Sequence, residues 1–376
     1  MYYNDFLGNK VSALGFGAMR LPEDDSATEE MVDICINSGI NYFDTAYPYC
    51  FGKSELLMGK LLTKYPRESY YLADKYPGHQ PASSYNPAEI FEEQLTKCRV
   101  DYFDYYLLHN VCENSIGVYE DPQWGIIDYF VNEHKKGRIR HLGFSSHGKP
   151  ENLSYVLSKY GDELEFCQIQ LNYLDWSLQE AEKKDEMLTQ LNKPVIAMEP
   201  LRGGKLAESS YDISNSFRFL QGLSNCRVVL SGMSSKEQLL ENIEIFNERK
   251  PLGETELSTL FEKAEGMKQS IPCTGCRYCV EGCPAGLDIP ELLKSYNDVK
   301  FAAEGFTVGM MIDSLPPEKR PGACLSCGKC SRICPQGIDI PAAMADFSEK
   351  IKLLPDWAAV CRERERIAKA NKCAQA

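Results

Sequence analysis

Residues 41–55 read NYFDTAYPYCFGKSE and hold the pattern around which the rest of the chain is organised. The first half, Asn41–Ala46, is apolar enough for a buried strand, and a short run of turn-forming residues follows it. An acid, Asp44, and a phenol, Tyr49, are therefore delivered to the end of a strand. Catalytic groups of a (β/α)₈ barrel lie at this end, although an isolated Asp there is more often a helix cap.

Two later segments also end on reactive side chains. Tyr70–Lys75 (YYLADK) ends on Lys75, and Tyr105–Asn110 (YYLLHN) carries His109 next to its end. An acid, a phenol, an ammonium group and an imidazole at successive strand ends form a set that can transfer protons. The alternative is a structural ion pair between the acid and the lysine, with the phenol only lining the mouth of a barrel.

Alternating strands and helices predict a (β/α)₈ TIM barrel over residues 1–250. Eight β/α units in about 250 residues match the barrel count. The rival fold, an open doubly wound sheet, lacks a G-x-G-x-x-G turn after the first strand. The predicted strands are Leu14–Met19, Asn41–Ala46, Tyr70–Lys75, Tyr105–Asn110, His141–His147, Glu165–Asn172, Pro194–Pro200 and Arg227–Met233.

Two helix starts can be predicted closely. Ser26 and Glu29 form a capping box ahead of a helix over Ala27–Ser38. Asn86 is expected to cap a helix whose first turn contains Pro87, since proline is favoured at that position.

Length and composition limit the classes of function. The chain of 376 residues is 43% hydrophobic, and its net charge of −13 gives no basic field for nucleic acid or anionic membranes. Residues 1–10 hold no apolar segment of a signal peptide, and no run of about eighteen apolar residues predicts a membrane span. We therefore expect a cytoplasmic protein that binds neither nucleic acid nor membrane.

Sixteen cysteines in such a chain indicate metal or free thiols rather than a disulfide framework. Half of them form two C-x₂-C-x₂-C-x₃-C-P motifs, a spacing typical of [4Fe–4S] clusters. Zinc is the alternative, but it needs neither a third cysteine at equal spacing nor a fourth before proline. The motif cysteines are Cys273, Cys276, Cys279, Cys283, Cys324, Cys327, Cys330 and Cys334.

The fourth cysteine of each motif is expected to ligate the other cluster, as it does in two-cluster ferredoxins. One predicted set is Cys273, Cys276, Cys279 and Cys334. The other is Cys324, Cys327, Cys330 and Cys283. Clusters exposed to oxygen degrade, so a reducing compartment fits this prediction.

The two motifs belong to an internal repeat. CPAGLDIPELL at residues 283–293 resembles CPQGIDIPAAM at residues 334–344, and each phrase is expected to start a helix. The spacing between the motifs resembles that of alpha-helical ferredoxins. We predict a small ferredoxin-like domain over residues 271–345, a linker over 251–270 and a helical tail over 346–376.

The first 250 residues resemble the aldo/keto reductase family, whose barrels move hydride between a nicotinamide cofactor and a carbonyl. The resemblance rests on GFGAMRLP, FDTAYPY, QIQLN and EPL, together with the Lys and His strand ends, in the expected order. It implies that Tyr49 is the proton donor and that Lys75 is the cation beside it. It further implies that Asp44 holds Lys75 in place and that His109 orients the substrate oxygen.

The resemblance also implies contacts with the nicotinamide ring. Ser145, Ser146 and Gln168 match the polar groups that hold the carboxamide. Met198 stands where many members stack an aromatic ring, and a thioether can cover a ring less firmly. Ordinary hydrogen bonding at the barrel rim is the alternative for the polar groups.

The phosphate contacts match the family less well. An Arg202-Gly203-Gly204 turn can receive a pyrophosphate, since small residues allow close backbone approach. Asn242 matches a residue of the family that contacts the cofactor. When the sequence is aligned on it, Gly232 and Gln238 occupy the positions at which NADP(H)-using members of the family bind the 2′-phosphate with a lysine and an arginine. Lys236 is the cation expected nearby. Selectivity for NADP(H) over NAD(H) therefore stays open.

These features predict an iron–sulfur oxidoreductase with two [4Fe–4S] clusters that reduces a carbonyl or related small molecule, using nicotinamide, cluster electrons or both. One alternative is a reductase without nicotinamide, in which electrons from ferredoxin or another carrier reach either a flavin or the substrate directly. Another is a binding barrel whose clusters are structural or sensory. The sequence does not identify the substrate.

Overall fold

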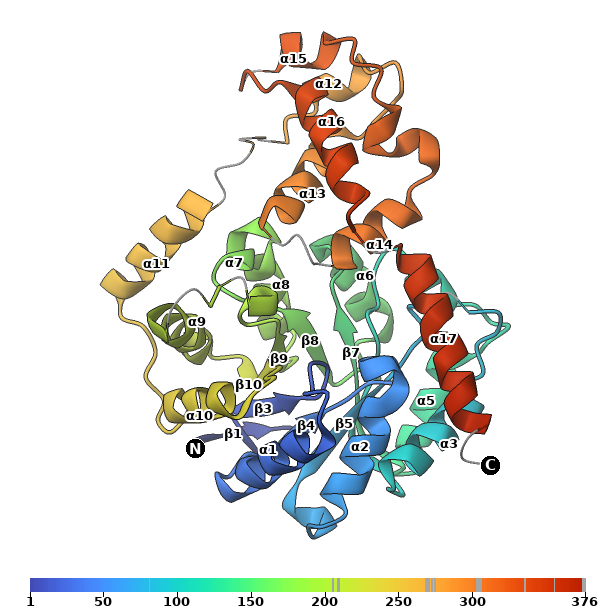
Figure 1. Cartoon of the computed structure of the whole chain (residues 1–376), viewed down its shortest axis with the longest axis vertical. Helices are drawn as coiled ribbons and strands as arrows, with labels where there is room; N and C mark the ends of the chain where they lie inside the picture. Colours follow the sequence, from blue (N-terminus) through green and yellow to red (C-terminus); the bar gives the residue numbers. More distant parts are fainter. Residues whose placement is uncertain are drawn as a thin grey trace. The chain divides into compact units, whose positions relative to one another are not determined.

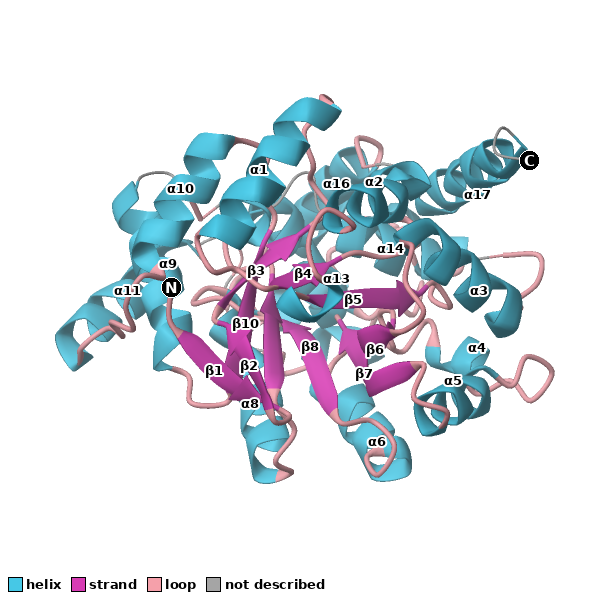
Figure 2. Ribbon diagram, turned by 90° about the horizontal axis from the view of Figure 1, so that it is seen from below, coloured by secondary structure: helices cyan, strands magenta, loops and turns pink. Residues whose placement is uncertain are grey.

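The first part of the chain folds into a closed barrel of eight parallel strands in the order β10-β3-β4-β5-β6-β7-β8-β9 (Figures 1 and 2). The computed structural model describes all residues except 81, 205, 208, 209, 268–270, 272, 274, 302–305, 335, 355 and 374–376. The barrel strands are β3 (Leu14–Gly17), β4 (Tyr42–Asp44), β5 (Tyr71–Tyr76), β6 (Phe103–Leu108), β7 (Ile139–Ser146), β8 (Phe166–Gln170), β9 (Val195–Met198) and β10 (Cys226–Ser231). The predicted barrel fold is confirmed.

Helices connect and surround the strands. They are α1 (Asp25–Asn37), α2 (Lys53–Leu62), α3 (Pro87–Cys98), α4 (Ile116–Tyr119), α5 (Ile126–Lys135), α6 (Pro150–Tyr160), α7 (Asp175–Leu178), α8 (Ala181–Gln190), α9 (Ser210–Gly222) and α10 (Lys236–Ile245), with short 3₁₀ turns η1 (Tyr49–Gly52), η2 (Arg67–Ser69) and η3 (Arg202–Gly204). The Asn86 side chain caps α3 by accepting from the Glu89 backbone N–H at 3.2 Å, as predicted. At α1 the prediction was wrong, because the cap is Asp24, which accepts from the Ser26 backbone N–H at 2.9 Å.

A hairpin of β1 (Tyr3–Phe6) and β2 (Asn9–Ser12) precedes the barrel and was not predicted. Its Phe6 is fully buried, with its ring stacked on that of Tyr105 at 4.6 Å between centroids and edge-on to Phe166 at 5.4 Å. Phe166 begins β8, so the hairpin covers the end of the barrel at which the strands start. The opposite end is left for the βα loops.

Two compact units make up the chain: residues 1–201, 206–257 and 364–376 form one, and residues 202–205 and 258–363 form the other. The helices from residue 254 onward are α11 (Glu254–Met267), α12 (Tyr278–Glu281), α13 (Ile289–Phe301), α14 (Phe306–Ser314), α15 (Lys329–Ile333), α16 (Ile340–Ile351) and α17 (Trp357–Cys373), with η4 (Pro317–Lys319) and η5 (Pro321–Ala323).

The second unit has its own apolar core. Leu292 and Leu293 of α13 pack in one buried cluster with Met344 and Phe347 of α16. Each motif is followed by such a helix, because the apolar residues of the repeated phrase recur at helical spacing. α11 lies within the stretch predicted as a linker. The predicted domain boundaries stay predictions.

Candidate functional site

The site begins where β4 ends. Asp44 is the last residue of β4, and Tyr49 opens the 3₁₀ turn η1. Directly after Tyr49, Cys50 and Phe51 adopt left-handed backbone conformations with φ of 50° and 56°. Such conformations cost of order 1–3 kcal/mol each for residues other than glycine and occur where a structure holds a functional group in place. Tyr49 is therefore directly followed by a strained turn.

The Lys75 ammonium group joins the ends of two strands. Lys75 lies on β5 with its side chain fully buried, and its Nζ forms an ion pair with the Asp44 carboxylate. The same Nζ donates to the Thr45 carbonyl at 2.7 Å and lies 4.8 Å from the centroid of the Tyr49 ring. The structure therefore brings together the acid, the phenol and the ammonium group that the strand ends predicted.

His109 directly follows β6, the strand that pairs with β5. Its ring centroid lies 5.8 Å from that of Tyr49, with the rings nearly perpendicular. Its backbone N–H donates to the Tyr76 carbonyl at 3.1 Å, and its carbonyl accepts from the Tyr119 hydroxyl at 2.6 Å. Within the described part of the chain, the buried Nδ1 atom of His109 has no hydrogen-bond partner. A ligand can supply that partner.

Burial and charge set the protonation of these groups. Burial lowers the pKa of Lys75, but Asp44 and Tyr49 raise it by more, so the ammonium group stays charged. Burial raises the pKa of Tyr49 and Lys75 opposes this, with a net increase that keeps the phenol protonated at neutral pH. Burial lowers the pKa of His109 well below its usual range, so this imidazole is neutral. The site offers one cation and two neutral hydrogen-bonding groups.

The residues predicted to hold a carboxamide lie at the ends of β7 and β8. Ser145 Oγ accepts from the Asn110 N–H at 2.8 Å, and Ser146 Oγ donates to the Val111 carbonyl at 2.7 Å. Both serines thus hydrogen-bond to the segment that follows His109, as the alternative of ordinary hydrogen bonding at the barrel rim expected. Their contact with a cofactor stays a prediction.

Gln168 and Met198 lie next to each other. Gln168 Nε2 contacts Met198 Sδ at 3.5 Å. Gln168 Oε1 is buried and lacks a hydrogen-bond partner among the described residues. An unsatisfied buried carbonyl is costly, and the amide N–H₂ of a nicotinamide can satisfy it. This unpaired acceptor beside Met198 therefore fits the carboxamide group of a nicotinamide.

The residues predicted to contact phosphate are already engaged in contacts of their own. Lys236 pairs with Glu30 at 2.6 Å on the surface, and the Asn242 side chain donates to Ser231 Oγ at 2.9 Å. Arg202 is buried and pairs with Asp298 at 3.0 Å within the second unit. Gly203 and Gly204 both have positive φ, of 68° and 94°, which glycine adopts without strain.

A cation missed in the sequence lies beside Gly232. The aliphatic stem of Arg20, in the loop after β3, lies about 3.6 Å from where a Cβ of Gly232 would stand. Arg20 is exposed, and the described part of the chain offers it no ion pair. The expectation that Lys236 is the cation near this position was therefore incomplete. GFGAMRLP contains Arg20, but the sequence gives no sign that its loop folds toward β10.

Two more histidines missed in the sequence lie at the same end of the barrel. The His79 ring lies 4.3 Å from that of His109, and His147 Nδ1 lies 3.0 Å from Gln170 Oε1. His147 also donates its backbone N–H to the Asn110 side chain at 3.0 Å. His79 lies in the turn after β5 and His147 directly follows β7, and this position after a strand was the signal available in the sequence.

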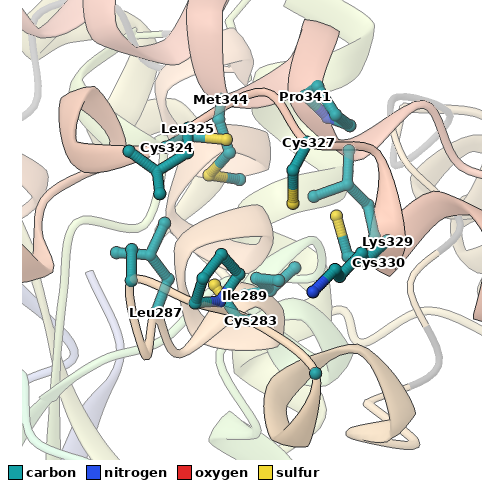
Figure 3. Close-up of a pocket in the computed structure, with 14 residues that line it drawn as sticks. Cys283, Leu287, Ile289, Cys324, Leu325, Cys327, Lys329, Cys330, Pro341 and Met344 are labelled. Atoms are coloured by element: carbon teal, nitrogen blue, oxygen red, sulfur yellow. The ribbon is translucent and has the colours of Figure 1, made fainter.

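In the second unit the motif cysteines line two separate cavities. The first is lined by Cys283, Cys324, Cys327 and Cys330, with Leu287, Ile289 and Met344 among its apolar walls (Figure 3). The second is lined by Cys273, Cys276, Cys279 and Cys334. Each cavity thus takes three cysteines from one motif and the fourth from the other, which is the grouping predicted from the sequence.

The donor chemistry of these cavities fits iron–sulfur clusters. Each cavity offers four thiols. The empty volume, which includes space open to solvent, is about 360 Å³ in the first cavity and about 310 Å³ in the second. No group of three or more His, Cys, Asp or Glu side chains among the described residues is arranged to hold a single metal ion. Cys276 and Cys327 are exposed, whereas Cys279 and Cys330 are buried, so one edge of each site faces solvent.

A barrel that brings together an acid, a phenol, an ammonium group and an imidazole where its strands end, followed by two cysteine-lined cavities, is typical of the class of iron–sulfur oxidoreductases. Residues 13–244 match the model of the aldo/keto reductase family, and residues 272–338 match that of a 4Fe-4S dicluster domain. The first match spans more than half of the chain. The chain therefore belongs to the aldo/keto reductase family, and neither match supports a flavin.

Individual relatives resemble the barrel over nearly their whole length. An uncharacterized oxidoreductase, YqkF, of Bacillus subtilis is 26% identical over 295 residues, covering 66% of this chain and 92% of its own. L-galactose dehydrogenase of Arabidopsis thaliana is 25% identical over 296 residues, covering 65% and 88%. The solved aldo-keto reductase AKR11C1 from Bacillus halodurans has a TM-score of 0.57 at 24% identity, covering 68% and 93%, and shows the same fold.

The structure also bears on membrane association. Among the described residues, no helix is both long and apolar enough to cross a bilayer.

Proposed function

We propose that the barrel reduces the carbonyl group of a small molecule with a nicotinamide cofactor, and that Tyr49 supplies the proton. The observation that carries this proposal is the Lys75 ammonium group, which is paired with Asp44 and lies 4.8 Å from the Tyr49 ring centroid. A structural ion pair would not require a phenol beside it.

The residues divide the chemical work between them. The nicotinamide supplies hydride, and the carbonyl oxygen that becomes an alkoxide needs a proton in the same step. The Tyr49 hydroxyl donates that proton, while Lys75 stabilises the phenolate left behind. Asp44 keeps the buried ammonium group in place. Neutral His109 donates a hydrogen bond to the substrate oxygen and orients it toward Tyr49.

Assays of the anaerobically purified protein test this proposal. A panel of aldehydes and ketones that includes sugar aldehydes is mixed with NADPH or NADH, and cofactor oxidation is followed by absorbance. The sugar aldehydes are included because the Arabidopsis relative is named for a sugar. Carbonyl-dependent oxidation of either cofactor supports the proposal, and inertness toward the whole panel with both cofactors contradicts it.

The cofactor preference should be weak. Gly232 and Gln238 offer no charge to a 2′-phosphate, and a phosphate without a bidentate arginine loses its strongest hydrogen bonds. Arg20 is the one cation that we place beside Gly232, so we expect NADPH to bind no more than about tenfold more tightly than NADH. Fluorescence titration of both cofactors measures the ratio.

The variant Arg20→Gln isolates the source of this preference. It should bring the two dissociation constants together and leave NADH binding unchanged. Lys236→Gln is the matched control, since Lys236 is held by Glu30, and it should leave both constants unchanged. A thousandfold preference for NADPH that survives Arg20→Gln would show that another cation binds the phosphate.

We also propose a second route, in which the clusters replace the nicotinamide as the source of electrons and a reduced ferredoxin or another carrier refills them. In this route the carbonyl takes up two electrons singly, one from each cluster, and two protons, one from Tyr49 and one from solvent, to give the alcohol. A hydride carries two electrons, and each cluster passes one at a time, so two clusters match a two-electron reduction. The alternative is that the clusters only stabilise the fold of a small domain, because the apolar core of a small domain is often too small to do so without a metal centre.

Removing one cluster should slow turnover driven by reduced carrier. Cys276→Ala should lose the cluster of its set and lower this turnover at least tenfold. Circular dichroism checks folding, and iron analysis checks cluster loss. Cys361→Ala, at a buried cysteine outside both motifs, is the control. Full turnover by folded, cluster-depleted Cys276→Ala protein would leave the clusters with a structural role.

A further inference from the structure

Three cations surround the first of the two cysteine-lined cavities. Lys329 is one of its lining residues (Figure 3). Lys319 Nζ donates to the carbonyl of Ala285, another lining residue, at 3.1 Å. The Arg332 guanidinium lies 3.8 Å from where a Cβ of Gly328 would stand, next to Lys329 in the chain. Lys319, Lys329 and Arg332 together form the basic rim of this cavity.

The charge of the basic rim is not compensated locally. Its three residues are exposed, and none of them forms an ion pair within the described part of the chain. Residues 319–338 hold four cations and no acid, although the whole chain has a net charge of −13. Only the fourth cation, Arg320, pairs with an acid, Asp313, at 3.8 Å. The surface around this cavity therefore reverses the charge of the protein.

The internal repeat shows that this charge is specific to one cavity. When the two repeated phrases are aligned, Glu281 stands at the position of Arg332. Among the described residues that line the second cavity, the one cation is Arg277, and it pairs with Asp288 at 3.0 Å. Two cavities with the same thiol ligands thus present surfaces of different charge.

An exposed apolar side chain and an exposed thiol lie beside the basic rim. Leu325 lines the first cavity and is 68% exposed, and Cys327, two residues later, is exposed as well (Figure 3). An apolar contact within a polar rim is the pattern of a protein interface. A cluster ligand exposed at the same place puts the edge of the cluster within reach of a docked redox centre.

We propose that the basic rim and Leu325 dock a small acidic electron-carrier protein, and that the cluster of this cavity is the one that receives its electrons. The inference rests on the proposed second route, in which a reduced carrier refills the clusters. In each encounter the carrier is oxidised by one electron and the cluster is reduced by one, and no bond or proton is transferred. Complementary charge speeds the encounter and orients the carrier, while a small contact area lets it leave again.

Binding to the full-length protein loaded with both clusters tests the proposal. The probe is an acidic bacterial ferredoxin, followed by calorimetry without oxygen. It should bind at about 0.05 M salt, and its Kd should rise at least about tenfold at about 0.5 M salt, because salt screens pairs of exposed charges. Absence of binding at low salt, or a Kd that does not change with salt, would overturn the inference.

Charge reversals locate the surface. Lys329→Glu and Arg332→Glu should each raise the Kd of the ferredoxin at least about tenfold at low salt. Lys352→Glu is the matched control, since Lys352 is exposed and lies about 18 Å along α16 from Ile340 in the cavity wall. It should leave Kd within about threefold of wild type. Unchanged binding by both rim variants, with the iron content of the wild type, would overturn the inference.

Cross-linking of the wild type does not depend on the stability of any variant. A carbodiimide activates a carboxylate of the ferredoxin and takes up the oxygen that leaves when a contacting lysine forms the amide. Mass spectrometry should identify Lys319 and Lys329 as the main cross-linked lysines. Cross-links mainly to lysines of residues 1–201, or between two copies of this chain through the basic rim, would assign the surface differently and overturn the inference.

Reduction of the clusters without any carbonyl separates this inference from the proposed function. Stopped-flow absorbance should show that the reduced ferredoxin reduces the clusters of Arg332→Glu at least about tenfold more slowly than those of the wild type. If this result holds and no carbonyl is reduced, the second route has failed and the docking surface stands. If carrier-driven carbonyl reduction is equally fast in the wild type and both rim variants, the docking surface is refuted and the route stands.

Discussion

Replacing Tyr49 with phenylalanine should lower kcat for carbonyl reduction by about 10²- to 10⁴-fold, the range that a positioned general acid contributes. The change removes only the hydroxyl, so the ring stays between Lys75 and His109, which it contacts at 4.8 and 5.8 Å. Cofactor dissociation constants and the melting temperature should change little. The loss then belongs to the transition state rather than to binding.

Tyr47→Phe is the matched control for this experiment. Tyr47 lies two residues earlier in the same segment, but its hydroxyl is directed to Glu93 at 3.4 Å and its ring lies under Lys97. Loss of this hydroxyl should leave kcat within about threefold of wild type. Single-turnover kinetics should accompany both variants, because slow product release can hide a chemical defect. Wild-type single-turnover rates in Tyr49→Phe would refute the role assigned to Tyr49.

Most of the barrel could be predicted because its strands are buried on both faces. Such strands appear as continuous apolar runs, and each of the eight predicted segments overlaps a strand of the structure. The hairpin of β1 and β2 was missed because its strands have only four residues each and Phe6 gains its burial from Tyr105, far along the chain. The cap at Asp24 was missed because Asp24 and Ser26 are both good N-cap residues. Which of them caps α1 depends on where the preceding loop turns into the helix.

The residues of the candidate site also fall into a group that the sequence could predict and a group that it could not. Asp44 and Lys75 lie within strands whose pattern is visible in the sequence, and Tyr49 follows one of them closely. Arg20 and His79 lie in loops whose course depends on distant contacts, such as the one between Gly78 and Tyr119. A sequence motif can mark a loop as important. It cannot show which strand end the loop folds toward.

The cysteines should belong to clusters in a crosswise pattern, and pairs of substitutions can show this by iron content. Wild-type protein purified without oxygen should hold about eight irons, from two clusters of four. Cys273→Ala combined with Cys334→Ala removes two ligands from one cavity and none from the other. About four irons should therefore remain.

The reciprocal pair is the matched control, because it removes two ligands from the same motif. Cys273→Ala combined with Cys283→Ala takes one cysteine from each cavity, so both clusters should be lost and iron should fall toward zero. If each motif instead held its own cluster, the two results would be exchanged. Zinc near stoichiometry with little iron in the wild type would contradict both patterns.

The crosswise pattern has a physical consequence for the second unit. Each cluster would tie a segment near α12 to a segment near α15, which lie far apart in sequence but belong to one apolar core. Losing either cluster should therefore loosen both halves of the repeat together. Thermal unfolding of the two double variants followed by circular dichroism should show one broad transition of this unit at lower temperature, while the barrel transition stays in place. Independent melting of the two halves would indicate that each motif folds around its own metal.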